Sequence, residues 1–512
     1  MNTDVKTDRA GWGTAAWVGI SAGFAEAATQ WLLGDLPLPL WNGIAVMFSG
    51  VAWGAAVAVV LGCVTQVVAI RRPVLALLGF AAVAGTSVAV YGAVLLTHPA
   101  VRNADAARTL AIVGALCTLG VAVAGRLPRK PAIGWSVAAA AIALSAAIST
   151  ALQPLPPTAA GPTIVLVSID GLRADALPPE GTLAAWAARS AQYTRAVTPT
   201  TDRLAAAKAL LPTRPHPCDT DISPLPMPSA AFVSSAEMSE LRSGFHKFDD
   251  DFSLVQGLSS TTPGRLFRLV GLHRPPQRRD ASVTLDAAAS WLATNKGGQF
   301  AWIHLDDPRP PFEPGDPWDK RFVPTGTAPD PSDPIWMTSQ YQGEVAAVDH
   351  HLARLFVALP NDAIVAVVGT YGEPLTPPFN ADGPPLPGLD ASIVPLIIGG
   401  PGVDPGQIRW PVSTRDVGPT LLALAGASRG GPTLPSPDEV PTSLMVASGL
   451  SLGGDPTVLG VGPTSAVLRR PGKAPAPLQL DGQLGPATNS TLETFVREVA
   501  AGDRGIRCGS TP

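Results

Sequence analysis

The stretch Gly161-Pro-Thr-Ile-Val-Leu-Val-Ser-Ile-Asp170-Gly-Leu-Arg173-Ala-Asp175 decides the fold of the larger part of this chain. Its apolar, β-branched run has the length of a buried parallel strand, and it ends abruptly in an Asp, a Gly and an Arg. Ligand sites of parallel α/β sheets lie at the carboxyl ends of the strands. The stretch therefore predicts a strand that delivers the Asp170 carboxylate into a crevice at one edge of a sheet.

Strand-like and helical segments alternate after this stretch. Apolar runs predict strands at Ala230–Ser234, Phe300–His304, Ala363–Gly369 and Val394–Gly399. Amphipathic patterns predict helices at Ser282–Ala293, Gln340–Ala358 and Thr414–Ala425. Such alternation is typical of an α/β sandwich with a parallel sheet. The Pro/Gly-rich stretches 305–335 and 372–390 are expected to be long surface loops at strand ends.

The segment before Leu155 carries most of the hydrophobicity. The chain has only 15% charged residues and a mean hydropathy of +0.23, which is too apolar for an ordinary soluble protein. Apolar runs near the roughly 20 residues that a bilayer core requires recur there, so a cleavable signal peptide is a poor alternative. The candidate spans are Trp12–Leu33, Trp41–Ala69, Pro73–Leu96, Thr109–Gly125 and Ile133–Leu152. We expect an α-helical membrane bundle of about five spans at residues 1–152.

Basic residues in the connections set the orientation. They precede the first span and separate the second from the third and the fourth from the fifth: Lys6, Arg9, Arg71, Arg72, Arg126, Arg129 and Lys130. The positive-inside rule then places the N-terminus in the cytoplasm. We expect a multi-pass protein of a bacterial-type cytoplasmic (inner) membrane, with a Pro-rich linker at 153–162 and an extracytoplasmic domain at 163–512.

Four cysteines divide between the two regions. Cys63 and Cys117 lie in candidate spans, where a cysteine is usually a small apolar filler. Cys218 and Cys508 fall in the predicted outer domain, which would lie in an oxidising compartment. A disulfide between Cys218 and Cys508 is therefore expected.

A series of motifs follows in order between residues 161 and 425. The segments are Ile169–Asp175, Tyr193–Pro199, Ala209–Thr213, Ala231–Ser234, Gly244–Asp250, His304–Phe312, Tyr341–Asp349, Gly369–Glu373, Val394–Ile398 and Asp416–Leu422. In this order they resemble the conserved segments of the sulfatase branch of the alkaline-phosphatase superfamily. Ile169–Asp175 resembles its "IDTLRAD", Ala209–Thr213 its "SLLTG", and Ala231–Ser234 with Gly244–Asp250 its "AFVS…GFDxFD". His304–Phe312 resembles "HLxDPHxPY", Tyr341–Asp349 resembles "YxxEVxxVD", and Gly369–Glu373 stands in place of "SDHGE". The resemblance implies an α/β domain of the alkaline-phosphatase type with a central, mostly parallel sheet.

The same resemblance implies a divalent metal site, which this chain matches only in part. Asp170 stands at the position of the family's first metal ligand. Thr370 and Tyr371 stand where the family has an Asp-His ligand pair, and Arg309 replaces a substrate-binding His. Threonine carries no charge and tyrosine is protonated near pH 7, so neither compensates a dication as the lost pair would. Asp170 is thus either a retained ion contact or a remnant that caps a helix or pairs with Arg173.

The nucleophile position is also altered. Counting back without gaps from Leu210 and Leu211, it falls on Arg203, which stays protonated and cannot attack. Thr200 and Thr201 are close enough to serve if the loop carries a small deletion. Without a metal or a nearby base, however, a threonine hydroxyl is a poor nucleophile.

Two functional classes remain open. The first is a pseudoenzyme without a cofactor, which binds either an anionic envelope ligand or a protein partner. The residues that would bind the anionic ligand are Arg173, Arg203, Arg309 and Tyr371. The arrangement of five spans followed by an outer sulfatase-like domain resembles that of inner-membrane proteins that regulate lipopolysaccharide synthesis. The second is an active, divalent-metal-dependent sulfatase, or a phosphoethanolamine- or glycerophosphate-type transferase, acting on envelope lipids or glycans.

Charge narrows the choice of partners. The net charge of −4 and the lack of a basic cluster interleaved with aromatic residues argue against a nucleic-acid role. Membrane lipids, anionic envelope glycans or a membrane protein are the expected partners. The sequence alone does not choose among them.

The orientation can be tested with reporter fusions. Because the arginine-biased connections should stay in the cytoplasm, a reporter fused after Gly161 should register outside and one fused after Arg129 inside. The opposite pattern would refute the extracytoplasmic assignment of the large domain.

Overall fold

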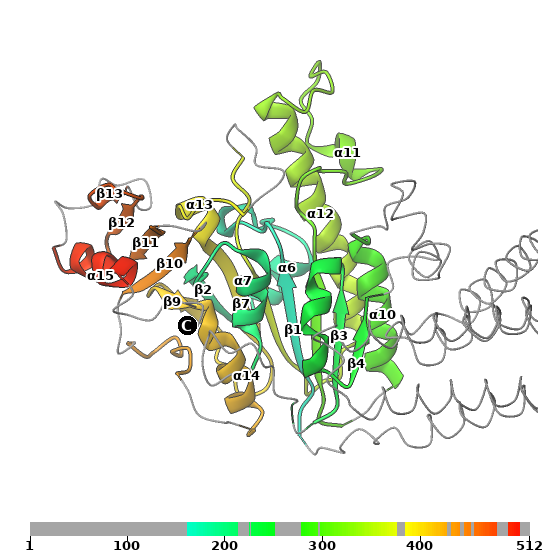
Figure 1. Ribbon diagram of the computed structural model, residues 1–512. Coiled ribbons are helices and arrows are strands. Elements are labelled where there is room, and N and C mark those ends of the chain that lie inside the picture. The colour runs from blue at the N-terminus through cyan, green and yellow to red at the C-terminus, as the bar shows by residue number, and fades with distance from the viewer. Residues whose placement is uncertain are drawn as a thin grey trace, which may run out of the picture. The chain divides into compact units, whose positions relative to one another are not determined.

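Strand β1 (Ile164–Ile169) lies in the interior of a nine-stranded sheet, as its largely apolar sequence predicts (Figure 1). All of its residues are buried. It pairs in parallel with β5 (Phe300–Leu305) on one side and β6 (Ile364–Gly369) on the other, without a register shift. A strand whose residues are all buried requires cover on both faces of its sheet, which is the usual arrangement in α/β folds.

The structure is a computed structural model, and it describes part of the chain. The described residues are 161–212, 225, 227–250, 278–294, 297–375, 384–427, 432–440, 445–451, 455–478 and 490–501. The five candidate spans, Cys218 and Cys508 lie outside these ranges. Within them, no helix has the length and apolar character needed to cross a bilayer.

The sheet is parallel except for one strand. Its order is β4-β3-β5-β1-β6-β7-β2-β8, and β9 pairs with β2. The further strands are β2 (Ala191–Val197), β3 (Ser229–Val233), β4 (Lys247–Asp249), β7 (Ile393–Gly399), β8 (Gly406–Ile408) and β9 (Val412–Ser413). Only β7, among these described strands, runs antiparallel to its neighbours β6 and β2. The predicted mostly parallel sheet is confirmed, and each of the four other predicted strands agrees within one residue at either end.

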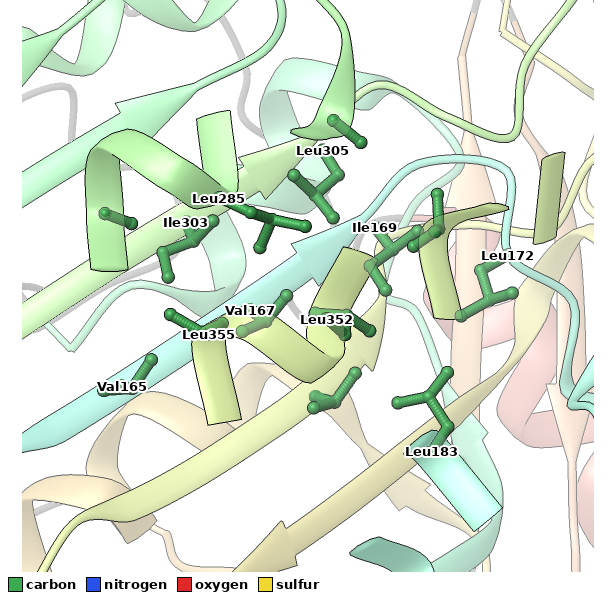
Figure 2. Packing of buried hydrophobic residues seen from close by; sticks show 14 of the residues in the cluster. Val165, Val167, Ile169, Leu172, Leu183, Leu285, Ile303, Leu305, Leu352 and Leu355 are labelled. Carbon is green, nitrogen blue, oxygen red and sulfur yellow. The ribbon is translucent and has the colours of Figure 1, made fainter. Parts of the chain in front are cut away.

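Three helices bury one face of this sheet. They are α6 (Thr182–Ala187), α10 (Ala281–Thr294) and α12 (Pro334–Ala358). Figure 2 shows Val165, Val167 and Ile169 of β1 packed among Leu285 of α10 and Leu352 and Leu355 of α12. Alternate residues of β1 thus face one helical layer.

Helix α12 begins at Pro334 rather than at the predicted Gln340. The Asp333 side chain accepts a hydrogen bond from the Ile335 N–H at 2.9 Å, and Pro334 occupies the first turn. Both are ordinary helix-start signals, which the loop prediction for 305–335 overlooked. That stretch also contains the short helix α11 (Trp318–Arg321).

The other two predicted helices agree more closely with the structure. Helix α10 covers the prediction at Ser282–Ala293. The prediction at Thr414–Ala425 corresponds to a 3-10 turn (Thr414–Asp416) followed by α14 (Val417–Leu424).

A second sheet was not predicted. Strands β10 (Val446–Leu450), β11 (Thr457–Val461), β12 (Ala466–Arg469) and β13 (Ala476–Leu478) form an antiparallel sheet, covered by α15 (Ser490–Ala501). These strands are short and interrupted by Gly and Pro, so their periodicity is weak. A backbone hydrogen bond from Gly449 N–H to Pro199 O, at 3.0 Å, ties this sheet to the loop after β2.

Asp349 of α12 anchors the start of α6. Its carboxylate accepts hydrogen bonds from the Thr182 N–H at 3.0 Å and the Leu183 N–H at 2.7 Å. Gly181 precedes them with φ +125, and a Cβ there would lie 2.1 Å from Asp349 Oδ2. The carboxylate therefore satisfies donors that the helix itself cannot satisfy.

Removing this anchor should destabilise the domain. In Asp349→Ala two donors lose their charged acceptor, so the free energy of unfolding should fall by about 1–3 kcal/mol. Asp286→Ala, which removes an exposed ion pair between Asp286 of α10 and Arg354 of α12, is the matched control and should change it by less than about 0.5 kcal/mol. Equal effects in a denaturant titration would contradict the anchoring role.

Candidate functional site

Three neighbouring strands bring their carboxyl ends to one place. Ile169 of β1 is in register with Leu305 of β5 and with Gly369 of β6. The next residues along these strands are Asp170, Asp306 and Thr370, and all three are buried. Their backbones continue the sheet, since Asp170 N–H donates to Leu305 O at 2.9 Å and Thr370 N–H to Ile169 O at 3.0 Å. The register alone therefore sets two carboxylates and a hydroxyl side by side.

Arg203 reaches into this cluster from α7 (Arg203–Leu210). The preceding Asp202 caps the helix by accepting a hydrogen bond from Ala205 N–H at 2.8 Å. The guanidinium donates from Nε to Asp170 Oδ2 at 2.9 Å and from Nη2 to Asp306 Oδ1. Nη1 donates to Glu237 Oε2 at 2.8 Å. One guanidinium thus joins two buried carboxylates and a third at the rim.

Asp170 is held as a carboxylate by its neighbours. Its Oδ1 accepts from the Thr370 hydroxyl, and His304 Nε2 lies 3.5 Å from its Oδ2. Burial works to raise the pKa of Asp170, but His304 and Arg203 outweigh it and hold the pKa well below the ordinary value. Asp170 does not pair with Arg173, so that expectation is not met.

His304 is a buried, hydrogen-bonded residue of β5. Its Nδ1 lies 3.0 Å from Ser168 Oγ, which also accepts from Trp302 Nε1 at 2.9 Å. The Ser168 hydrogen is then available to Nδ1, which favours the ring form with its hydrogen on Nε2, facing Asp170. The hydrogen-bonded side chains of Trp302, Ser168 and His304 inside the sheet thereby orient the His304 ring toward the Asp170 carboxylate.

Arg278 holds the other side of the cluster. Its Nε forms an ion pair with Asp306 Oδ2 at 2.8 Å, and its Nη2 one with Asp307 Oδ1 at 2.6 Å. Its Nη groups also donate to the carbonyl oxygens of Asp306, Arg309 and Pro310. Arg278 and Glu237 were missed at the sequence level, because neither lies in a strand-end motif and only the folded chain brings them here.

Arg309 has the most loosely held guanidinium at the site. Its Nη1 lies 3.7 Å from Asp306 Oδ1, whereas its backbone N–H donates to Glu344 Oε2 at 3.0 Å. Glu344 also accepts from Glu313 N–H at 2.6 Å, so this carboxylate of α12 fixes the loop that carries Arg309. The guanidinium itself keeps donors available for a ligand.

Tyr371 and Glu373 lie near the same cluster. Burial raises the pKa of Tyr371 well above its ordinary value, and the carboxylates of Asp170 and Glu373 raise it further, so the phenol stays protonated. Burial raises the pKa of Glu373 to about 7, against the opposing effect of Arg309. Tyr371 is therefore a hydrogen-bond donor, and Glu373 is about half protonated near neutral pH.

Arg173 points to a different set of carboxylates. Its Nη2 lies 2.7 Å from Asp175 Oδ2, and its Nη1 lies 3.7 Å from Asp390 Oδ2. Its backbone N–H donates to the Tyr341 hydroxyl at 3.0 Å, and that hydroxyl donates to Gly171 O at 3.0 Å. Tyr341 therefore fixes the turn after β1. Gly171 is required in that turn, because it has φ +72 and a Cβ would lie 1.8 Å from Pro308 O.

The two candidate nucleophiles are occupied in other ways. The Thr201 hydroxyl is buried and donates to Pro385 O at 2.5 Å. The Thr200 hydroxyl accepts from Asp202 N–H at 3.2 Å, at the start of α7. Among the contacts of the described residues, neither hydroxyl meets a side chain that could accept its proton.

The residues present do not fit a divalent cation while Arg203 holds its place. In the described ranges, no group of three or more His, Cys, Asp or Glu side chains is arranged to hold a metal ion. Asp170 is already paired with a guanidinium, and the neighbouring Thr370 hydroxyl donates to it. At an effective dielectric constant of about 20, unit charges about 4 Å apart interact by about 4 kcal/mol, so Arg203 would offset by about 8 kcal/mol the attraction of the carboxylates for a dication.

Comparison with known proteins agrees with this fold. Residues 230–427 match the family model for sulfatases. The chain carries a sulfatase-family domain. The predicted sulfatase-like α/β domain is thereby confirmed. No protein of curated function matches the chain significantly.

Two solved structures illustrate the likeness. Ps i-CgsB, solved in complex with k-i-k-neocarrahexaose, has a TM-score of 0.50 and 16% identity, over 68% of this chain and 94% of its own. The phosphonate monoester hydrolase SpPMH from Silicibacter pomeroyi has a TM-score of 0.47 and 16% identity, over 67% of this chain and 96% of its own. At such low identity the likeness concerns the fold, and the activities of those proteins do not carry over to this chain.

Proposed function

We propose that this chain is a membrane-anchored, extracytoplasmic sulfatase-like protein that does not turn over esters and instead binds an anionic envelope ligand. One observation carries the proposal: the Arg203 guanidinium lies between Asp170 and Asp306, where the family's chemistry requires a nucleophile and a cation. The apolar segments in residues 1–152 support the anchor. The basic residues in the connections between the candidate spans support the placement of the large domain on the extracytoplasmic side.

The loss of turnover follows from the chemistry of the side chains. Ester cleavage in this family's manner needs a nucleophile activated by a base or a metal. Arg203 cannot attack, and Thr201 already donates its hydrogen to a carbonyl oxygen. Thr370 donates to Asp170 rather than supplying negative charge to a metal. Activity would therefore require Arg203 to leave the cluster.

Arg309 is the best candidate for contact with an anion. Arg173 and Arg203 were also expected as ligand residues, but nearby carboxylates already balance their charges at short range. The guanidinium of Arg309 lies 3.7 Å from its nearest carboxylate oxygen, and the protonated Tyr371 is a second donor in the same cluster. A guanidinium suits a phosphate or sulfate because it can donate two parallel hydrogen bonds.

The ligand is proposed to be a membrane lipid headgroup or an anionic glycan of the envelope. The linker at 153–162 is short and Pro-rich, so a domain attached to the bilayer by it would stay near the membrane surface. A protein partner that presents a carboxylate or phosphate would use the same guanidinium. Binding assays with defined lipids separate these cases.

The full-length protein should be inactive as a hydrolase. Purified protein should release no product from p-nitrophenyl sulfate or phosphate with added Mn²⁺, Mg²⁺, Ca²⁺ or Zn²⁺, since the site lacks an activated nucleophile. Turnover that disappears in Asp170→Ala and in Thr200→Ala or Thr201→Ala would overturn the proposal.

Anion binding should depend on Arg309, salt and pH. Phosphatidylglycerol should bind the detergent-solubilised protein more tightly than phosphatidylcholine does, and Arg309→Ala should weaken its binding about tenfold or more. Arg354→Ala, which removes the arginine of the exposed ion pair between α12 and Asp286 of α10, should leave the affinity unchanged.

The pH dependence has a definite sign. Glu373, with a pKa of about 7, is neutral below that pH, and burial also raises the pKa of Glu237. Binding should therefore be tighter at pH 6 than at pH 8, and weaker in high salt at either pH. An affinity independent of Arg309, or one that rises with pH, would contradict the assignment.

A further inference from the structure

We propose that the Arg203 guanidinium is the resident cation of this site, a built-in replacement for a divalent ion. The same cluster supports the proposed function, but the two claims are distinct. The function concerns turnover and ligand binding, whereas this inference concerns what neutralises Asp170 and Asp306. It is therefore tested by the response of the folded state to added cations.

The guanidinium uses each of its nitrogens within the cluster. Nε donates to Asp170, Nη1 to Glu237, and Nη2 to both Asp306 and the Ser235 hydroxyl. Such a planar fork can bind several oxygens in fixed directions, which a lysine ammonium on a flexible stem cannot do. The arrangement is that of a positively charged centre surrounded by oxygen atoms.

Each oxygen of the two buried carboxylates already lies against a hydrogen-bond or ion-pair partner. Asp170 Oδ1 accepts from Thr370 and Oδ2 from Arg203. Asp306 Oδ1 pairs with Arg203, and Oδ2 pairs with Arg278 at 2.8 Å. Arg203 and Arg278 thus place positive charge directly against the two buried carboxylates. A hard dication needs several oxygen ligands, and it would have to displace partners already in place.

The position of Arg203 in its helix supports the same conclusion. It is the first residue of α7, and a positive charge is unfavourable near a helix N-terminus because the helix dipole is positive there. The local sequence therefore gives no reason for an arginine at this position. Its side chain carries the charge away from the helix and onto Asp170 and Asp306, where burial makes compensation necessary.

Removing the guanidinium should uncover a cation site. In Arg203→Ala the carboxylates of Asp170 and Asp306 would face each other without the charge that now joins them. The midpoint of thermal unfolding should fall by roughly 5–15 °C, since breaking a buried ion pair leaves uncompensated charge. Mn²⁺, Ca²⁺ or guanidinium ion, far below denaturing concentrations, should then restore part of the loss by binding the folded state.

Thermal unfolding of the full-length protein tests the inference. The wild-type midpoint should not change with a chelator or with added Mn²⁺, Mg²⁺, Ca²⁺ or Zn²⁺, whereas that of Arg203→Ala should rise with the concentration of Mn²⁺, Ca²⁺ or guanidinium ion. The gain should vanish in Asp170→Asn/Arg203→Ala. Arg279→Ala is the matched control, because Arg279 is also buried and pairs with Asp249 at 2.7 Å. It should lower the midpoint without creating a cation response.

Two results would overturn the inference. The first is a wild-type midpoint that rises with a divalent cation and loses this response in Asp170→Asn. The second is a folded Arg203→Ala protein that responds to none of the cations. If that variant does not fold, Arg203→Gln serves instead, since it also removes the charge and should gain the same response. If neither variant folds, the response of the wild-type unfolding midpoint to added divalent cations decides whether Arg203 is the resident cation. Turnover without any metal would refute only the proposed function.

Discussion

The ion pair of Arg203 with Asp170 and Asp306 is the interaction on which the site depends. The sheet fixes these carboxylates in place, because three apolar strands in register end at the same level and the polar residues follow immediately. Both carboxylates are fully buried, and a buried charge without compensation is strongly destabilising. A positive centre between them is therefore a requirement of the fold, and this chain supplies it from the first turn of α7.

The motif residues divide into two groups by physical role. Those that hold backbone are retained: Tyr341 fixes the turn after β1, Glu344 fixes the loop that carries Arg309, and Asp349 caps α6. Those of the second group meet at the strand ends, where Arg203 forms an ion pair with Asp170 and Thr370 donates a hydrogen bond to it. The first group thus stabilises the architecture, and the second compensates the buried charge of Asp170.

The sequence predicted those parts of the fold that depend on local pattern. Apolar runs located the central strands within a residue, and counting along the motif brought Arg203 to the place where it meets Asp170. It did not indicate that Arg203 would be neutralised by Asp306, or that Arg278 would join them, since these contacts depend on tertiary structure. The second sheet was missed because its strands are short and interrupted by Gly and Pro.

The most direct measurement is a diffraction experiment near the manganese absorption edge, on crystals of the full-length protein equilibrated with Mn²⁺. Our account predicts guanidinium density joining Asp170 and Asp306, and no anomalous peak within coordination distance of either carboxylate. A manganese ion bound by Asp170, with the Arg203 side chain turned away, would contradict it.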